Sequence, residues 1–169
     1  MSLIVEKSSR HTRIVGIFGE HVVCNWLSRS GFEASVVDHT GMDIIAYDPK
    51  TKYRLGITVK SRTRDSGKET AGVNIFKNDH HDREKLTNAC EAFNCVPWIA
   101  VYVECETDAE LYLISLAHYD GRYGNKQKRV VDTWSMSQKS KQEYDSDPEV
   151  FCIHSRFAHK MWPPNAKER

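Results

Sequence analysis

The run VPWIAVYV, residues 96 to 103, is the longest uninterrupted apolar stretch of the chain. It is far too short to span a bilayer, which takes about 20 residues as a helix. Its length suits a β-strand, and a strand without polar alternation is typically buried on both faces, in the middle of a sheet. The segment WIAVYVE, residues 98 to 104, is therefore predicted to be the central strand of an α/β fold.

Two helices are predicted from apolar residues that recur at helical spacing. The first runs from about residue 15 to residue 30 and ends at Gly31, because glycine takes a positive φ at little cost. Gly19 lies inside it, where glycine costs about 1 kcal/mol against alanine, so we expect a close approach of helix to sheet there. The second begins at Asn78 or Asp79, either of which can cap it. Its apolar stripe consists of Leu86, Ala89, Cys90 and Phe93.

The other predicted strands are short and are separated by turn-forming residues. The stretch GMDIIAYDPKTKYRLGITVKSR, residues 41 to 62, is typical of two strands joined by a tight polar turn. Further strands are predicted at FEASVVD, VNIF and ELYLISLA. The polar segment 61–72 contains glycine and is predicted to be a loop. The predicted order of the core is then α-β-β-β-α-β-β.

The pattern weakens after residue 119. A basic loop at 120–129, a short helix within 133–149 and a last strand at VFCIHSRF are predicted there. The segment has too few apolar residues for a core of its own. We therefore interpret residues 1–169 as a single domain with a core at 12–118 and a C-terminal appendage at 119–169. The aromatic residues Trp134, Tyr144 and Trp162 are suited to stacking on bases or to a dimer contact, although simple packing is their commoner role.

The amino-acid composition excludes few classes of function. The 169 residues carry a formal net charge of +1, so a nucleic-acid partner would have to meet a local basic patch. The five cysteines are odd in number and form no C-x-x-C, which favours neither a disulfide framework nor a zinc ribbon. No signal-peptide pattern or membrane span is expected, and a reducing cytoplasm is the expected compartment.

The hairpin carries an acid and a base where packing alone would favour apolar residues. If its turn is centred between residues 51 and 52, Asp43 lies opposite Lys60 and Ile45 lies opposite Thr58. The other face of the hairpin is then apolar and suited to a core. A cross-strand ion pair, worth at most about 1 kcal/mol when exposed, is the plain interpretation of Asp43 and Lys60.

The order of several motifs favours a second interpretation. The run FGEHVVCNWLSRSGFEAS, followed by GMDIIAYD, GITVKSR and FNCVPWIAVYV, resembles the PD-(D/E)xK nuclease superfamily over roughly residues 14 to 117. It looks closest to the archaeal Holliday-junction-resolvase and Mrr-like branches. The resemblance implies a restriction-endonuclease-like α-β-β-β-α-β core, with a central mixed sheet flanked by helices. It also implies hydrolysis of DNA with Mg²⁺ or Mn²⁺, and a homodimer, since cutting two strands calls for two sites.

The resemblance assigns the catalytic residues by position. Glu20 matches the acid of the first helix, Asp43 the strand aspartate and Lys60 the motif lysine. Asp43 and Glu20 would bind the metal ion together with the backbone carbonyl of Val59, and Lys60 would orient the attacking water. His21 stands where the resolvases often have a basic residue, and Met42 replaces the proline of the motif.

Thr58 departs from the family, which has a carboxylate two residues before the lysine. Its hydroxyl is a neutral oxygen and so only a weak candidate ligand for a hard cation. Three outcomes stay open. In the first, the remaining ligands and the substrate phosphate jointly bind an ion. In the second, Asp38, Asp79 or Asp82 supplies the missing carboxylate from elsewhere in the chain. In the third, the site is inactive and the fold only binds nucleic acid.

Basic residues that follow the motif lysine are candidates for phosphate contacts. They are Arg62, Arg64 and Lys68, with KQKR at 126–129 as a second candidate, and a merely solvated basic loop is the alternative. The favoured prediction is a divalent-metal-dependent DNA endonuclease. The alternatives are a catalytically inactive protein of the same fold that binds nucleic acid or a protein partner, and an unrelated α/β protein with an exposed ion pair.

Overall fold

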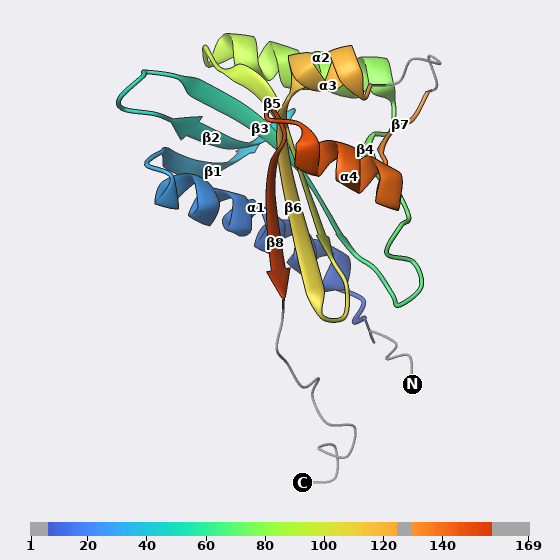
Figure 1. The fold of residues 1–169 in the computed structure, drawn as a ribbon. Coiled ribbons are helices and arrows are strands. Elements are labelled where there is room, and N and C mark those ends of the chain that lie inside the picture. The colour runs from blue at the N-terminus through green and yellow to red at the C-terminus, as the bar shows by residue number, and fades with distance from the viewer. Residues whose placement is uncertain (1–6, 125–129, 157–169) are drawn as a thin grey trace, which may run out of the picture.

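A sheet of six strands forms the middle layer of the molecule (Figure 1). The computed structural model describes residues 7–124 and 130–156, and for Asp38 the backbone alone. The six strands are β1 (Glu33–His39), β2 (Met42–Tyr47), β3 (Arg54–Thr63), β5 (Val96–Glu104), β6 (Asp108–Ser115) and β8 (Phe151–Arg156). They lie in the order β1-β2-β3-β5-β6-β8, and the sheet is mixed because β3 and β5 are parallel while the other neighbours are antiparallel.

Helices cover both faces of this sheet (Figure 1). One face carries α1 (His11–Arg29). The other face carries α2 (Asp79–Ala92), α3 (Leu116–Arg122), α4 (Gln138–Ser146) and a small sheet made of β4 (Val73–Phe76) and β7 (Asp132–Trp134). The predicted α/β fold with a central mixed sheet is therefore confirmed. None of the described helices is long and apolar enough to cross a membrane.

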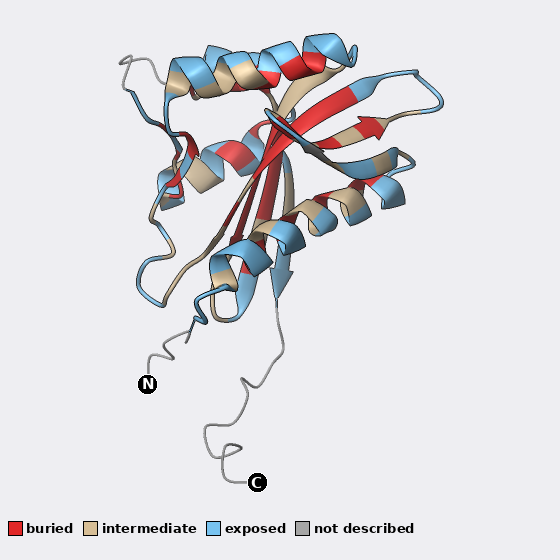
Figure 2. Ribbon diagram, turned by 180° about the vertical axis from the view of Figure 1, so that it is seen from behind, coloured by how far each residue is buried: buried red, intermediate tan, exposed pale blue. Residues whose placement is uncertain are grey.

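β5 is buried on both faces, as its sequence predicts (Figure 2). Ile99, Val101 and Val103 belong to the core that lies between the sheet and α2. Ala100 and Tyr102 point the other way, into the core beneath α1. Because alternate residues of one strand enter two different cores, this strand cannot tolerate a polar face.

α1 begins at His11, four residues before the predicted start. The sequence pattern missed this turn because Ile14 is exposed and Val15 is the first buried residue of the helix. Gly31 follows its end with a φ of +94°, as predicted. The close approach expected at Gly19 is confirmed, since a Cβ there would lie 2.0 Å from the Oγ of Ser61 in β3.

The β2–β3 hairpin has a different register from the predicted one. Asp48 starts the turn, because its carboxylate accepts hydrogen bonds from the backbone N–H of residue 50 (2.9 Å) and the hydroxyl of residue 51 (2.6 Å). The turn is centred one residue earlier than expected, and Ile44 lies opposite Ile57. The predicted pairing of Asp43 with Lys60 is therefore wrong. The register is displaced by two residues, an even number that leaves each side chain on its predicted face.

The chain after residue 119 joins the same sheet and the same core. α4 and β8 confirm the predicted short helix and last strand, while α3 extends to Arg122, into a segment predicted to be a loop. β8 pairs with β6 at the edge of the sheet. Trp134 and Tyr144 are buried in the core on the α2 side, with ring centroids 4.1 Å apart. Their role is therefore packing, whereas Trp162 and the segment 126–129 lie outside the described residues.

Arg83 connects α2 to α3 and β7. Its guanidinium forms ion pairs with Asp79, Asp120 and Asp132. Asp132 is only 3% exposed and also accepts a hydrogen bond from the hydroxyl of Tyr119 (2.8 Å). A buried carboxylate needs such partners, because its desolvation is otherwise uncompensated.

Gly41 sets the distance between the β1–β2 turn and α2. Its φ is +112°, and a Cβ built on it would lie 2.3 Å from the carbonyl oxygen of Lys85. Gly41→Ala is therefore expected to lower the free energy of unfolding by about 2–4 kcal/mol, through backbone strain plus a steric clash with α2. Chemical denaturation measures this loss. Gly67→Ala is the matched control, because Gly67 also has a positive φ (+84°) but has nothing within 4 Å of the added Cβ. Equal losses in the two variants would contradict a close contact at Gly41.

Candidate active site

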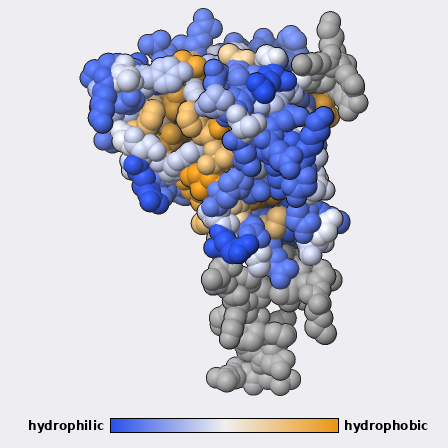
Figure 3. Space-filling model, in the orientation of Figure 1, coloured by the Kyte–Doolittle hydropathy of each residue, from blue (hydrophilic) through white to orange (hydrophobic). Residues whose placement is uncertain are grey.

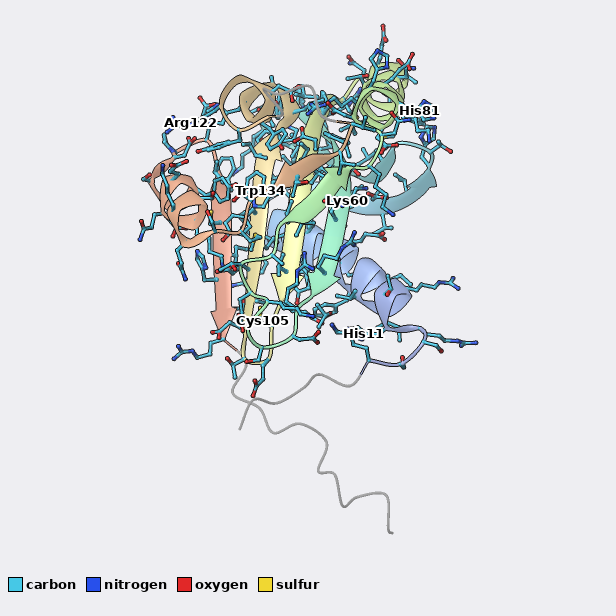
Figure 4. All side chains as sticks on the ribbon, turned by 90° about the vertical axis from the view of Figure 1, so that its right-hand side faces the viewer. His11, Lys60, His81, Cys105, Arg122 and Trp134 are labelled. Carbon is cyan, nitrogen blue, oxygen red and sulfur yellow. The ribbon has the colours of Figure 1, made fainter. Side chains whose placement is uncertain are left out.

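A cavity of about 390 Å³ opens beside Asp43 and Lys60, on the face of the sheet that α2 covers. Side chains of β2 and β3 form its floor, and β4, the first half of α2 and the β1–β2 turn form its sides. In Figure 4, Lys60 lies on β3 below α2. The polar and charged residues that line the cavity are Thr40, Asp43, Thr58, Lys60, Arg62, Asn74, Lys77, Asp82 and Lys85.

Three of the sequence-predicted residues form a chain of hydrogen bonds in this cavity. The Nζ of Lys60 donates to the Oγ1 of Thr58 (3.0 Å), and that hydroxyl donates to the Oδ2 of Asp43 (3.2 Å). Thr58 is 5% exposed, so its hydroxyl would lack water as a partner without these contacts. The threonine thus joins the acid to the base, in place of a direct contact between them.

Asp43 also takes part in the backbone of the sheet. The paired residues of β2 and β3 begin at Ile44 and Ile57, and beyond that point the Oδ2 of Asp43 accepts the backbone N–H of Val59 (2.6 Å). Where β2 and β3 diverge, the carboxylate therefore takes the place of the backbone carbonyl that a paired strand would offer to this N–H. Both of its hydrogen bonds use Oδ2, which leaves Oδ1 as the oxygen suited to a ligand.

The lining of the cavity is basic. Lys60 and Arg62 project from β3, while Lys77 and Lys85 come from the α2 side. The acids of the lining are Asp43 and Asp82, so cations outnumber acids although the whole chain carries only +1. The Oδ2 of Asp82 accepts the backbone N–H of Lys77 (2.9 Å) and Asn78 (3.0 Å), which closes the corner between β4 and α2. Such a cavity attracts anions.

Glu20 lies on α1 and does not line this cavity. It is half-buried, one residue after the close contact of Gly19 with the sheet. Burial, and next the charge of Glu20, raise the pKa of the nearby Cys24 thiol. The structure thus brings Asp43, Thr58 and Lys60 together in one cavity, with Glu20 on the helix of the opposite face.

The predicted phosphate-binding residues take different positions. Arg62 lies in β3, which extends to Thr63, and not in the predicted loop, and its side chain lines the cavity. The Nη2 of Arg64 donates to the carbonyls of Ala71 (3.1 Å) and of Gly72, which ties the ends of the loop together. Burial, then the charge of Arg62, lower the pKa of Arg64. Lys68 is exposed within that loop.

Two carboxylates proposed as replacements for the missing acid can be placed. Asp79 forms an ion pair with Arg83, while Asp82 lines the cavity. The side chain of Asp38 lies outside the described part of the chain. No cluster of three or more His, Cys, Asp and Glu suited to a metal ion occurs among the described residues. Oδ1 of Asp43 is nevertheless a charged oxygen of the kind that Mg²⁺ binds, because this ion keeps several waters and takes one or two carboxylates together with substrate phosphates.

Sequence reasoning missed Lys77 and Lys85, whereas Asp82, one of the candidate replacement carboxylates, does line the cavity. Lys85 precedes Leu86, the first member of the apolar stripe of α2, and so stands at the border between the buried and solvated sides of the helix. That border position is the only signal in the sequence that could have indicated it. Lys77 has no such signal, because the corner between β4 and α2 places it.

Comparison with known proteins supports the fold. No family model and no curated protein matches the sequence. The structure is similar to that of Hjc, a Holliday junction resolvase from the archaeal hyperthermophile Archaeoglobus fulgidus, with a TM-score of 0.54. The two chains are 16% identical, and the match covers 76% of this chain and 88% of the resolvase chain. At this identity the likeness shows the fold alone: this chain has a nuclease-like mixed α/β fold of the kind seen in that resolvase.

Proposed function

We propose that this protein is a divalent-metal-dependent endonuclease that hydrolyses DNA phosphodiester bonds. The observation that carries the proposal is the joint placement of Asp43, Thr58 and Lys60 in one basic cavity of a nuclease-like fold. The resolvase that shares this fold acts, by its name, on Holliday junctions. DNA, branched or duplex, is therefore the proposed substrate.

Each residue has a proposed role. Mg²⁺ or Mn²⁺ would lower the pKa of a bound water and neutralise phosphate charge. Asp43 would hold the ion through Oδ1, with the backbone carbonyl of Val59 as a further proposed ligand, whereas Glu20, which lies on α1 outside the lining of this cavity, is not assigned to the same ion. Lys60 would orient the attacking water and stabilise charge that develops on the phosphate. Arg62, Arg64 and Lys68 are the proposed substrate-binding residues.

A catalytically inactive protein that binds nucleic acid is the second candidate. Two observations favour it: Thr58 supplies no charge, and one oxygen of Asp43 is already used by the backbone of Val59. With one carboxylate beside it, an ion would depend on the substrate phosphate for binding. The cavity would then still attract a phosphate backbone without cleaving it.

A cleavage assay separates the two candidates. Supercoiled, linear, single-stranded and four-way-junction DNA are each incubated with the protein and Mg²⁺ or Mn²⁺, beside Asp43→Asn and Lys60→Ala. Metal-dependent cleavage that both substitutions abolish supports the enzyme. Retarded DNA without cleavage supports the binding protein, and no effect on any DNA contradicts both.

Thr58→Glu is expected to raise the affinity for Mn²⁺ by about tenfold or more, because a second carboxylate would stand beside Asp43 at the ion. Titration calorimetry without DNA measures the affinity. Thr58→Gln is the matched control, since it adds the same bulk without the charge. The same affinity in Thr58→Glu and Thr58→Gln would indicate that residue 58 does not face the ion.

The proposed assembly is a homodimer. An apolar hollow of about 280 Å³ supports it, lined by Trp26, Leu27, Ser30, Phe32, Tyr53, Leu55, Trp98, Leu113 and Phe151. Figure 3 shows apolar side chains gathered on this face of the molecule. Phe151 is 47% exposed and Tyr53 40% exposed, which is costly unless a partner covers them. Sedimentation equilibrium measures the mass, and the mass of one chain at micromolar concentration would contradict the dimer.

A further inference from the structure

Lys77 and Lys85 face the cavity from the α2 side, and the roles proposed above do not include them. Lys85 is half-buried in α2, and Lys77 is exposed at the corner between β4 and the helix. The position of this helix is fixed next to Asp43, because Gly41 allows the backbone at Lys85 to approach the β1–β2 turn. The backbone that carries Lys85 is therefore held close to the β1–β2 turn at the side of the cavity.

Neither lysine has an evident structural role. None of the ion pairs between described residues includes Lys77 or Lys85. Asp82, the acid that lines the cavity beside them, uses Oδ2 to hold backbone N–H groups of the corner. A cation just before a helix, as at Lys77, is also unfavourable, because the N-terminus already carries partial positive charge. Local stability therefore favours another residue at position 77.

We propose that Lys77 and Lys85 bind a phosphate of the nucleic-acid strand adjacent to the phosphate held at Asp43 and Lys60. The inference rests on the proposed function, since it takes the ligand of the cavity to be a nucleic-acid strand. The cavity of about 390 Å³ falls within the roughly 300–1,000 Å³ usual for ligand sites, so it has room for one unit of a strand. Lysine acts as a point charge on phosphate and reads no base, so this contact positions the strand whatever its sequence.

Charge explains why two separate phosphate sites are expected. Lys60 and Arg62 lie on β3, while Lys77 and Lys85 lie on the other side of the cavity. A single phosphate does not need four cations, whereas two successive phosphates of one strand would use a pair on each side.

Binding of a fluorescein-labelled dT₂₀ oligonucleotide tests the inference, with Ca²⁺ in place of Mg²⁺ so that cleavage does not interfere. Lys77→Gln and Lys85→Gln are each expected to weaken binding about 3- to 10-fold in low salt. Each is also expected to lower the slope of log affinity against log salt by about 0.7, the value for one lost contact to a single strand. Lys50→Gln is the matched control, because Lys50 is exposed in the β2–β3 turn, away from the cavity.

A double variant tests the separation of the two phosphates. If Lys60 and Lys85 contact different phosphates, the losses of Lys60→Gln and Lys85→Gln add in free energy. A combined loss clearly smaller than the sum would place both lysines on one phosphate and overturn the inference. Wild-type affinity and salt slope in Lys77→Gln and Lys85→Gln would also overturn it and leave the proposed function standing. Failure of the wild-type protein to bind any oligonucleotide would contradict the proposed function itself.

Discussion

Asp43→Asn is expected to lower the rate of metal-dependent DNA cleavage by about 10²- to 10³-fold while the protein stays folded. Asparagine keeps an oxygen that can accept the backbone N–H of Val59, now 2.6 Å from Oδ2 of Asp43, so the end of the β2–β3 hairpin is preserved. It removes the negative charge that would hold the ion. Single-turnover cleavage with saturating protein measures the rate, and thermal unfolding reports the stability.

Asp43→Ala distinguishes the two functions of this carboxylate. It removes the charge and also leaves the N–H of Val59 without its acceptor, which costs about 1–3 kcal/mol in a buried setting. The alanine variant should therefore be inactive and less stable, and the asparagine variant inactive and nearly as stable as the wild type. Cleavage at the wild-type rate by Asp43→Asn would exclude Asp43 as a ligand of the ion.

Arg83→Met is expected to lower the free energy of unfolding by about 3–5 kcal/mol, the largest stability effect we expect from one substitution. The change removes the partner of three carboxylates at once. One of them, Asp132, is 3% exposed, so water cannot stabilise its charge in place of the guanidinium. Methionine retains much of the bulk, so the loss reports on charge more than on packing. Urea denaturation followed by far-ultraviolet circular dichroism measures it.

Arg156→Met is the matched control for this ion-pair network. Arg156 pairs with Asp108 at 3.5 Å, but its side chain is 85% exposed, and an exposed pair is worth about 0–1 kcal/mol. Arg83→Met combined with Asp132→Asn should recover part of the loss, because asparagine carries no charge and still accepts from the hydroxyl of Tyr119. A loss below about 1 kcal/mol for Arg83→Met would contradict the buried network.

The layers of the fold are largely predictable from the sequence. The apolar run at 96–103 requires a strand covered on both faces, and α1 and α2 follow from the spacing of their apolar residues. The register of the β2–β3 hairpin is harder to predict, because it depends on which residue starts the turn. Asp48 decides it with two side-chain hydrogen bonds, and no apolar pattern records that choice. The predicted faces survived only because the displacement was even.

The candidate site is less predictable because several of its residues are placed by contacts between distant segments. Asp43, Thr58 and Lys60 are recognisable, since a hairpin keeps them on one face. Lys85 enters the cavity only because α2 packs against Gly41, and Lys77 because of the corner that Asp82 closes. Such long-range placement leaves no periodic signal in the chain.

The pairing of β4 with β7 makes the cavity depend on the last third of the chain. β4 supplies Asn74, Ile75 and Phe76 to the lining, and its only strand partner in the described part of the chain is β7. A protein truncated after residue 118 would lack β7, the partner of β4, and β8, the partner of β6. Two bare strand edges would then invite aggregation. Truncation to residues 12–118 is thus no harmless simplification for this protein, because strands that follow residue 118 pair with a strand of the cavity wall and with the edge of the central sheet.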